Sequence, residues 1–135
     1  MIYVGTDIVK VSRISQIISD HRERFLSRIF THHEQSICNA KASPHIHYSG
    51  RFAAKEAVYK ALSKSGVAGL GWREAEVIND RSGAPYIKLT GRCKTALESL
   101  TPEGYKPIVD ISLSDEPPYA LAYVVISAGT GIQDD

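Results

Sequence analysis

The sequence predicts an α+β fold in which an antiparallel sheet packs against one long helix. Helical patterns fill the first half of the chain, whereas the second half alternates in the manner of strands joined by hairpin turns. Helices and hairpins that are segregated along a chain are typical of α+β proteins. A chain of 135 residues suits one compact domain. We expect this single domain to span residues 1–128 and a flexible tail to follow at residues 129–135.

The chain is expected to open with a short strand and a helix. Residues 2–4 are apolar and read as a strand that Gly5 and Thr6 bring to an end. Isoleucine and valine then recur at helical spacing over residues 8–18. Asp7 would therefore lie just after the strand, where a side chain can project into a cleft.

Three further helical segments are expected before the middle of the chain. A short helix is predicted at residues 24–30, and Thr31 is expected to cap the helix after it. Residues 42–45 are predicted to form a loop. The strongest helical pattern, rich in alanine and lysine, covers residues 51–64 and is closed by Gly66.

The second half is expected to consist of two hairpins separated by a short helix. Alternating apolar residues, interrupted by turn-forming Asp, Ser, Gly and Pro, define these elements. In chain order they are strands 75–79 and 85–90 around a turn at 80–83, a helix at 92–100, and strands 108–114 and 119–127.

Charge and cysteine content narrow the class of protein. The formal net charge is +1, but residues 1–64 carry ten basic and five acidic side chains, and residues 65–135 carry six and ten. The basic half could meet an acidic or phosphorylated partner, or it could be an ordinary solvated surface. Cys38 and Cys93 are far apart and form no disulfide framework, which suits a reducing cytoplasm. No apolar run approaches the roughly 20 residues that span a membrane.

The helix at residues 51–64 carries the residues of greatest chemical interest. Ala53, Ala57 and Ala61 form a ladder of small side chains that lets another backbone approach closely. Glu56 and Lys60 are four residues apart and lie at the edge of this apolar face. Partial desolvation there would strengthen their electrostatic interactions. The alternative is an ordinary helical ion pair worth about 0.2–0.5 kcal/mol.

Asp7 adds a second carboxylate from another element. Two carboxylates with a lysine nearby suit a hard divalent cation together with a phosphate group. The sequence does not show that Asp7 and Glu56 are close in space, so the site depends on the fold bringing them together.

Five strings in the chain resemble one family. They are GTDIV at 5–9, GRFAAKEA at 50–57, KAL at 60–62, DRSGAP at 80–85 and ISLSDE at 111–116. In this order, over nearly the whole chain, they resemble the holo-[acyl-carrier-protein] synthases of the 4′-phosphopantetheinyl transferase family. The resemblance implies a 4′-phosphopantetheinyl transferase-like single domain. It also implies transfer of 4′-phosphopantetheine from coenzyme A to a serine of acyl carrier protein, with release of adenosine 3′,5′-bisphosphate in fatty acid biosynthesis.

The resemblance also implies roles for individual residues. Asp7 and Glu56 match the carboxylates that hold Mg²⁺ against the coenzyme A pyrophosphate, and Lys60 matches the lysine that neutralises charge there. These three are the expected catalytic residues. The general base would be Glu56 or a metal-bound water. Arg51 and Lys55, with Lys60, match the motif that lines the coenzyme pocket.

Further implied features concern the partners. The acidic carrier protein would dock on the early helical region, with the expected contacts at Arg13, Arg24 and Arg28. Family members of this length are usually homotrimers. Asp115 stands where some members have histidine, and Tyr59 where many have serine or alanine, so no role is carried over to either residue.

Two other functions remain open from the sequence. A non-catalytic protein that binds coenzyme A or another nucleotide would keep the basic pocket without needing both Asp7 and Glu56. A small RNA-binding domain could use the arginines between residues 13 and 28, but the chain lacks an aromatic stacking set for bases. We expect no nucleic acid and no membrane among the partners.

Overall fold

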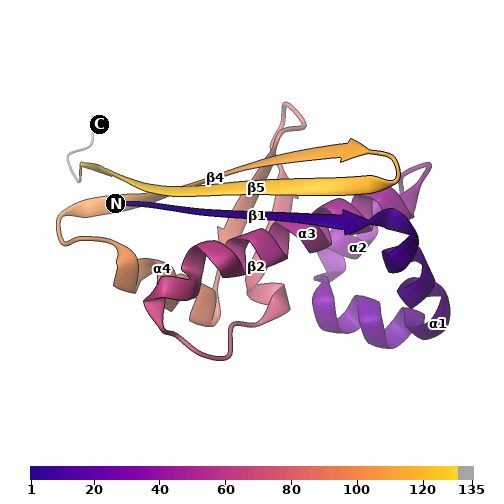
Figure 1. Ribbon diagram of the computed structural model, residues 1–135, viewed down its shortest axis with the longest axis horizontal. Coiled ribbons are helices and arrows are strands. Elements are labelled where there is room, and N and C mark those ends of the chain that lie inside the picture. The colour runs from indigo at the N-terminus through magenta and orange to yellow at the C-terminus, as the bar shows by residue number, and fades with distance from the viewer. Residues whose placement is uncertain (131–135) are drawn as a thin grey trace.

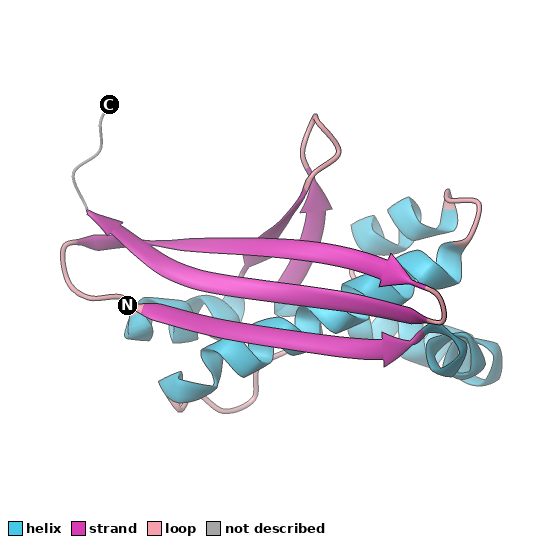
Figure 2. Ribbon diagram, turned by 45° about the horizontal axis from the view of Figure 1, so that its top comes forward, coloured by secondary structure: helices cyan, strands magenta, loops and turns pink. Residues whose placement is uncertain are grey.

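The computed structural model describes residues 1–130 of the chain. A three-stranded antiparallel sheet of order β1-β5-β4 lies over helix α3, and β2 and β3 form a separate two-stranded sheet (Figure 1). The turned view shows the three long strands on one side of the molecule and the helices on the other (Figure 2). The elements are β1 (Ile2–Lys10), α1 (Val11–Ile29), α2 (His32–Asn39), α3 (Pro44–Leu62), β2 (Ala75–Asn79), β3 (Pro85–Leu89), α4 (Gly91–Leu100), β4 (Tyr105–Glu116) and β5 (Tyr119–Thr130), with 3₁₀ turns η1 (Ser63–Ser65) and η2 (Trp72–Glu74).

The main core lies between the sheet and α3, which confirms the predicted α+β class. The inner face of β5 is built from small and branched side chains that are fully buried: Ala120, Ala122, Val124 and Ile126. The alanine ladder of α3 is buried opposite them. Small residues on both sides allow the helix and sheet backbones to approach closely, as the ladder predicted.

The predicted boundary between the first strand and helix is wrong. Strand β1 continues through Gly5 to Lys10, and α1 begins only at Val11. All nine residues of β1 pair with β5, and this pairing overrides the helical spacing of the apolar residues from Ile8 onward. Asp7 therefore lies within a strand, not after one.

The later helices follow the prediction with shifted ends. The two helices expected between residues 8 and 30 form the single element α1, bent at His21, where the backbone leaves helical geometry (φ −140°, ψ 41°). Thr31 caps α2 as expected. Helix α3 begins at Pro44, so the predicted loop at 42–45 is too long, because proline suits the first turn of a helix. Gly66, with φ of 72°, ends the 3₁₀ turn after α3.

The two hairpins are confirmed, and the second is longer than predicted. Strands β4 and β5 pair in register from Tyr105↔Thr130 to Glu116↔Tyr119. Residues 129 and 130 therefore belong to β5 and not to the expected tail, the rest of which lies outside the described residues. Within residues 1–130, no helix combines the length and apolar character needed to cross a membrane.

Candidate active site

The site is created by a close contact between β1 and α3. Gly5 faces the helix, and a Cβ built on it would overlap the carbonyl oxygen of Ala57 and crowd the amide of Ala61. Only glycine permits this approach. Since side chains alternate along a strand, Asp7 faces the helix on the same side as Gly5, one step further along β1.

Asp7 and Lys60 are in direct contact across this junction. The Nζ of Lys60 lies 3.1 Å from Oδ1 of Asp7 and donates a second hydrogen bond, of 2.8 Å, to the carbonyl oxygen of Thr6. The Asp7 side chain is 18% exposed, whereas that of Lys60 is 54% exposed. The carboxylate is thus held in a partly sheltered position, and the lysine remains open to a ligand.

Glu56 belongs to the same cluster. Burial raises the pKa of Glu56, and the negative charge of Asp7 raises it further, whereas Lys60 and Arg13 lower it. The two acids are therefore close enough to repel each other. Lys60 links the two acids, because it contacts Asp7 and lies one helical turn from Glu56, and the sharing of one cation by both carboxylates stays a prediction.

The donor set suits Mg²⁺. This ion commonly takes one or two protein carboxylates and completes its octahedron with water and phosphate oxygens. Asp7 and Glu56 offer two carboxylates, and a cation between them would offset the repulsion that raises the pKa of Glu56. No group of three or more His, Cys, Asp or Glu ligands occurs in the described part of the chain.

Arg51 lies one turn and a half before Glu56 on α3 and lines a separate cavity of about 90 Å³. His47, Ser114 and Asp115 line the same cavity. Arg51 is only 4% exposed, and its Nη2 donates to Oδ1 of Asn79 at 2.8 Å. Its Nε has no hydrogen-bond partner within residues 1–130. Burial, reinforced by Arg51, lowers the pKa of His47 and favours the neutral imidazole. The structure thus places a buried cationic residue at a cavity that the carboxylate of Asp115 also lines.

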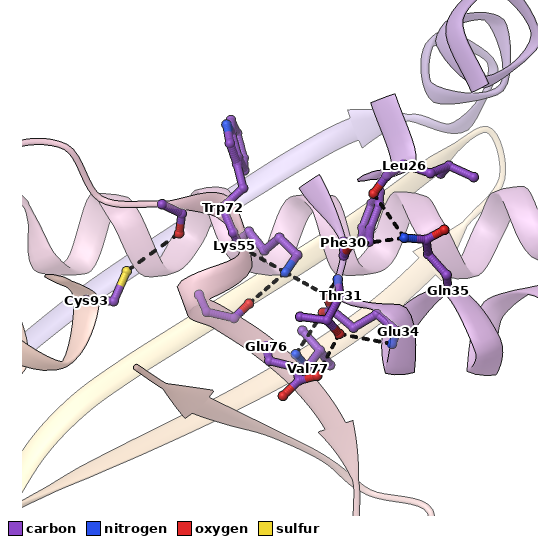
Figure 3. A network of polar contacts seen from close by, with 12 residues as sticks. Leu26, Phe30, Thr31, Glu34, Gln35, Lys55, Trp72, Glu76, Val77 and Cys93 are labelled. Atoms are coloured by element: carbon purple, nitrogen blue, oxygen red, sulfur yellow. Dashed lines mark hydrogen bonds and ion pairs between the residues drawn. The ribbon is translucent and has the colours of Figure 1, made fainter. Parts of the chain in front are cut away.

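The structure corrects the role that the sequence predicts for Lys55. It was expected to line the coenzyme pocket, but it is fully buried and its ammonium is saturated by internal acceptors (Figure 3). Its Nζ donates to Oε1 of Glu34 at 2.8 Å and to the carbonyl oxygens of Trp72 at 3.0 Å and Ala75 at 2.8 Å. All three donors of the ammonium are used, so Lys55 stabilises the fold and has no donor left for a ligand.

Glu34, which the sequence analysis did not single out, is the centre of this network. Its carboxylate accepts hydrogen bonds from the backbone amides of Thr31 (2.9 Å) and Val77 (2.9 Å), besides the bond from Lys55 (Figure 3). The Thr-x-x-Glu spacing of a capping box could have located it. Nothing in the sequence, however, pairs it with a lysine 21 residues away.

An aromatic cluster forms around Trp72, whose carbonyl oxygen belongs to this network. The ring of Trp72 stacks on Phe52 at a centroid distance of 5.3 Å and meets Tyr59 edge-on at 5.1 Å. Trp72 therefore packs against the helix that carries the site.

The arginines expected to dock a partner occupy two places along α1. Arg13 lies near Glu56, since its charge opposes the rise in the pKa of that carboxyl. Arg24 and Arg28 line a broad groove of about 530 Å³ together with Phe25. Both arginines are exposed. The groove combines basic and apolar character.

Comparison with known proteins identifies the family. Residues 3–124 match the model of the 4′-phosphopantetheinyl transferase superfamily. The holo-[acyl-carrier-protein] synthase of Rhodopseudomonas palustris (strain HaA2) is 43% identical over 132 residues, which cover 95% of this chain and 94% of the relative.

Solved structures agree with this match. The holo-[acyl-carrier-protein] synthase of Neisseria meningitidis superposes with a TM-score of 0.79 at 32% identity, over 94% of this chain and 99% of that one. The enzyme of Helicobacter pylori in complex with coenzyme A gives a TM-score of 0.72 at 28% identity, over 92% and 99%. The chain therefore belongs to the 4′-phosphopantetheinyl transferase superfamily, among the holo-[acyl-carrier-protein] synthases.

Proposed function

We propose that this chain transfers the 4′-phosphopantetheine arm of coenzyme A to a serine hydroxyl of an acyl carrier protein, in a reaction that depends on Mg²⁺. The observation that carries the proposal is the convergence of Asp7, Glu56 and Lys60 at the contact between β1 and α3. Membership of the superfamily and the coenzyme A complex of a relative support the choice of donor. In this role the protein would serve fatty acid biosynthesis in the cytoplasm.

The proposed reaction is an attack of the serine oxygen on the β-phosphorus of coenzyme A. The bond from that phosphorus to the bridging oxygen breaks, and adenosine 3′,5′-bisphosphate leaves with the bridging oxygen. Asp7 and Glu56 would hold Mg²⁺, which supplies Lewis-acid polarisation of the pyrophosphate. The exposed ammonium of Lys60 is placed to stabilise the charge that develops on the leaving phosphate. The carboxylate of Glu56 would accept the serine proton.

Mass spectrometry of a carrier protein tests the proposal. We expect the purified chain, incubated with coenzyme A, Mg²⁺ and apo-acyl carrier protein, to add the mass of one phosphopantetheinyl group to the acceptor. Chelation of the metal should abolish the gain. A chain that binds coenzyme A but never modifies the acceptor would instead be a non-catalytic coenzyme-binding protein, and the proposal would fail.

We place the docking site of the carrier protein on α1. Acyl carrier proteins are acidic, and the groove beside Arg24 and Arg28 offers positive charge together with the apolar ring of Phe25. Arg13, in the first turn of α1, lies near Glu56. Complementary charge of this kind steers association and fixes orientation.

We also propose that the protein assembles as a homotrimer through the outer face of its sheet. Ile2, Val4 and Ile8 alternate along β1 and are 73%, 53% and 59% exposed. Leu121 and Tyr123 of β5 lie beside them and are exposed as well. A contiguous apolar face of this kind marks an interaction surface. Sedimentation equilibrium should give three times the chain mass, and Val4→Glu should shift the protein to monomer; a wild-type monomer at micromolar concentration overturns the assignment.

A further inference from the structure

The β2-β3 hairpin is attached to α3 at both of its ends. It forms its own two-stranded sheet, which packs against β4 but shares no ladder hydrogen bonds with the main sheet. At its base, Lys55 of α3 donates to the carbonyl oxygen of Ala75 at 2.8 Å. At its far end, Arg51 of α3 donates to the side chain of Asn79, the last residue of β2, at 2.8 Å. Arg51 and Lys55 are one helical turn apart, so one face of α3 carries both attachments.

The amide of Asn79 is held on both sides. Its Oδ1 accepts the hydrogen bond from Arg51, and its Nδ2 donates to the carbonyl oxygen of Gly83 across the turn at 3.0 Å. The second bond fixes which end of the amide faces the guanidinium, since a reversed amide would present its NH₂ group to a cation. Asn79 is therefore a fixed acceptor for Arg51.

Arg51 keeps its charge available in this arrangement. The acceptor is a neutral amide and not a carboxylate, so the bond orients the guanidinium without neutralising it. Arg51 lines the cavity together with His47 and Asp115, and its buried Nε donor has no partner in the described structure. A buried donor left unsatisfied is costly unless a ligand satisfies it. The retained charge and the unsatisfied donor favour an anionic group in the cavity, against the opposing charge of Asp115.

We infer that Asn79 is a positioning residue, which holds the Arg51 guanidinium toward an anionic group of coenzyme A in the cavity between α3 and the end of β4. The inference rests on the proposed function, because coenzyme A is taken from it as the ligand. Asn79 itself is exposed at the end of a strand, so its replacement should leave the fold intact.

A double-mutant cycle on Arg51 and Asn79 tests the inference, with equilibrium binding of coenzyme A measured by titration calorimetry. We expect Asn79→Ala to raise the Kd, and the KM for coenzyme A, about tenfold, while kcat and the KM for the carrier protein change less than about twofold. Asn79→Asp should also weaken binding, because a carboxylate would neutralise Arg51. In an Arg51→Ala background, Asn79→Ala should have no further effect.

The matched control is Ser82→Ala in the same turn. It removes only the hydroxyl bond to Asp80 and changes no charge, so coenzyme binding should stay at the wild-type level. Additive effects of the two substitutions, or wild-type binding by Asn79→Ala, overturn the inference while the proposed function stands. A wild-type chain that binds coenzyme A but transfers nothing overturns the proposed function, and the binding cycle still decides the role of Asn79. A wild-type chain that does not bind coenzyme A overturns both.

Discussion

Gly5 in β1 packs so tightly against Ala57 in α3 that a side chain at position 5 would overlap the Ala57 carbonyl oxygen. This contact sets the distance between the strand that carries Asp7 and the helix that carries Glu56 and Lys60. The glycine is thus part of the geometry of the site, although it bears no reactive group.

Gly5→Ala should loosen this contact and impair the site. The added methyl group meets backbone atoms, which cannot move as a side-chain end can, so we expect a loss of about 1–3 kcal/mol in the free energy of unfolding. The rate of phosphopantetheine transfer should fall as well, because Asp7 would move away from Glu56. Urea denaturation and the carrier-protein mass gain measure the two effects. Gly50→Ala is the stability control, since an added Cβ there meets nothing within 4 Å. A Gly5→Ala protein with wild-type stability and activity would contradict the argument.

Glu56→Gln should abolish transfer without loss of stability. Because the folded-state pKa of Glu56 is raised, the ionised form weakens the fold at neutral pH, and a neutral side chain relieves that cost. The unfolding midpoint should therefore be equal to or above that of the wild type, while the mass gain disappears. Glu98→Gln, an exposed substitution on α4, is the control and should remain active. Retained metal-dependent activity in Glu56→Gln would remove this residue from the site.

Activity should fall as the pH is lowered, and added Mg²⁺ should partly restore it. A cation needs ionised carboxylates, and protons compete with it for Glu56. Since the pKa of Glu56 is raised, this competition begins at a higher pH than for an ordinary glutamate. The apparent Mg²⁺ requirement, measured as the concentration for half-maximal rate, should thus increase toward acidic pH. A metal requirement that is constant with pH would contradict the assignment of Glu56 as a ligand.

The buried ion pair of Glu34 and Lys55 should be essential for the stability of the fold but should not take part in binding coenzyme A. Lys55→Met leaves the Glu34 carboxylate buried and unpaired, which should cost about 3–5 kcal/mol in unfolding free energy. The double variant Glu34→Gln with Lys55→Met should recover part of this loss, because no isolated charge remains. Chemical denaturation of the two variants decides the matter. A Lys55→Met protein as stable as the wild type, but deficient in coenzyme binding, would restore the original assignment of Lys55.

Arg24→Glu should weaken recognition of the carrier protein and nothing else. Reversal of one charge in the basic groove should raise the KM for the carrier about tenfold or more, with the effect shrinking at high salt. The KM for coenzyme A should not change. Lys94→Glu on the exposed face of α4 is the matched charge reversal and should behave as wild type. Equal effects of the two variants would mean that net charge, and not the groove, guides docking.

Local signals in the sequence predicted the local structure well. The turn at residues 80–83 located the β2-β3 hairpin, and Thr31 marked the start of α2. The first strand was misjudged because Gly5 resembles a strand breaker unless the helix packed against it is known. Gly5 permits a contact with residues about 50 positions later in the chain, and local sequence patterns do not predict such a contact.

The site itself could be predicted only in part. The chemical types of Asp7, Glu56 and Lys60 match a cation and a phosphate, and the fold brings Lys60 into contact with Asp7, but their roles stay predictions. Lys55 was misassigned because a lysine beside these residues resembles a ligand-binding group. Its burial depends on Glu34, which reaches it from another helix.

The stacking of Trp72 on Phe52 gives the protein a built-in optical reporter. Trp72 is the only tryptophan in the chain, so its fluorescence can be assigned without labelling. Its own carbonyl oxygen accepts a hydrogen bond from Lys55, and its ring stacks on Phe52 of the helix that carries Glu56. Rearrangements of α3 that accompany a catalytic cycle would therefore register as changes in emission wavelength or intensity on the millisecond scale of stopped-flow mixing.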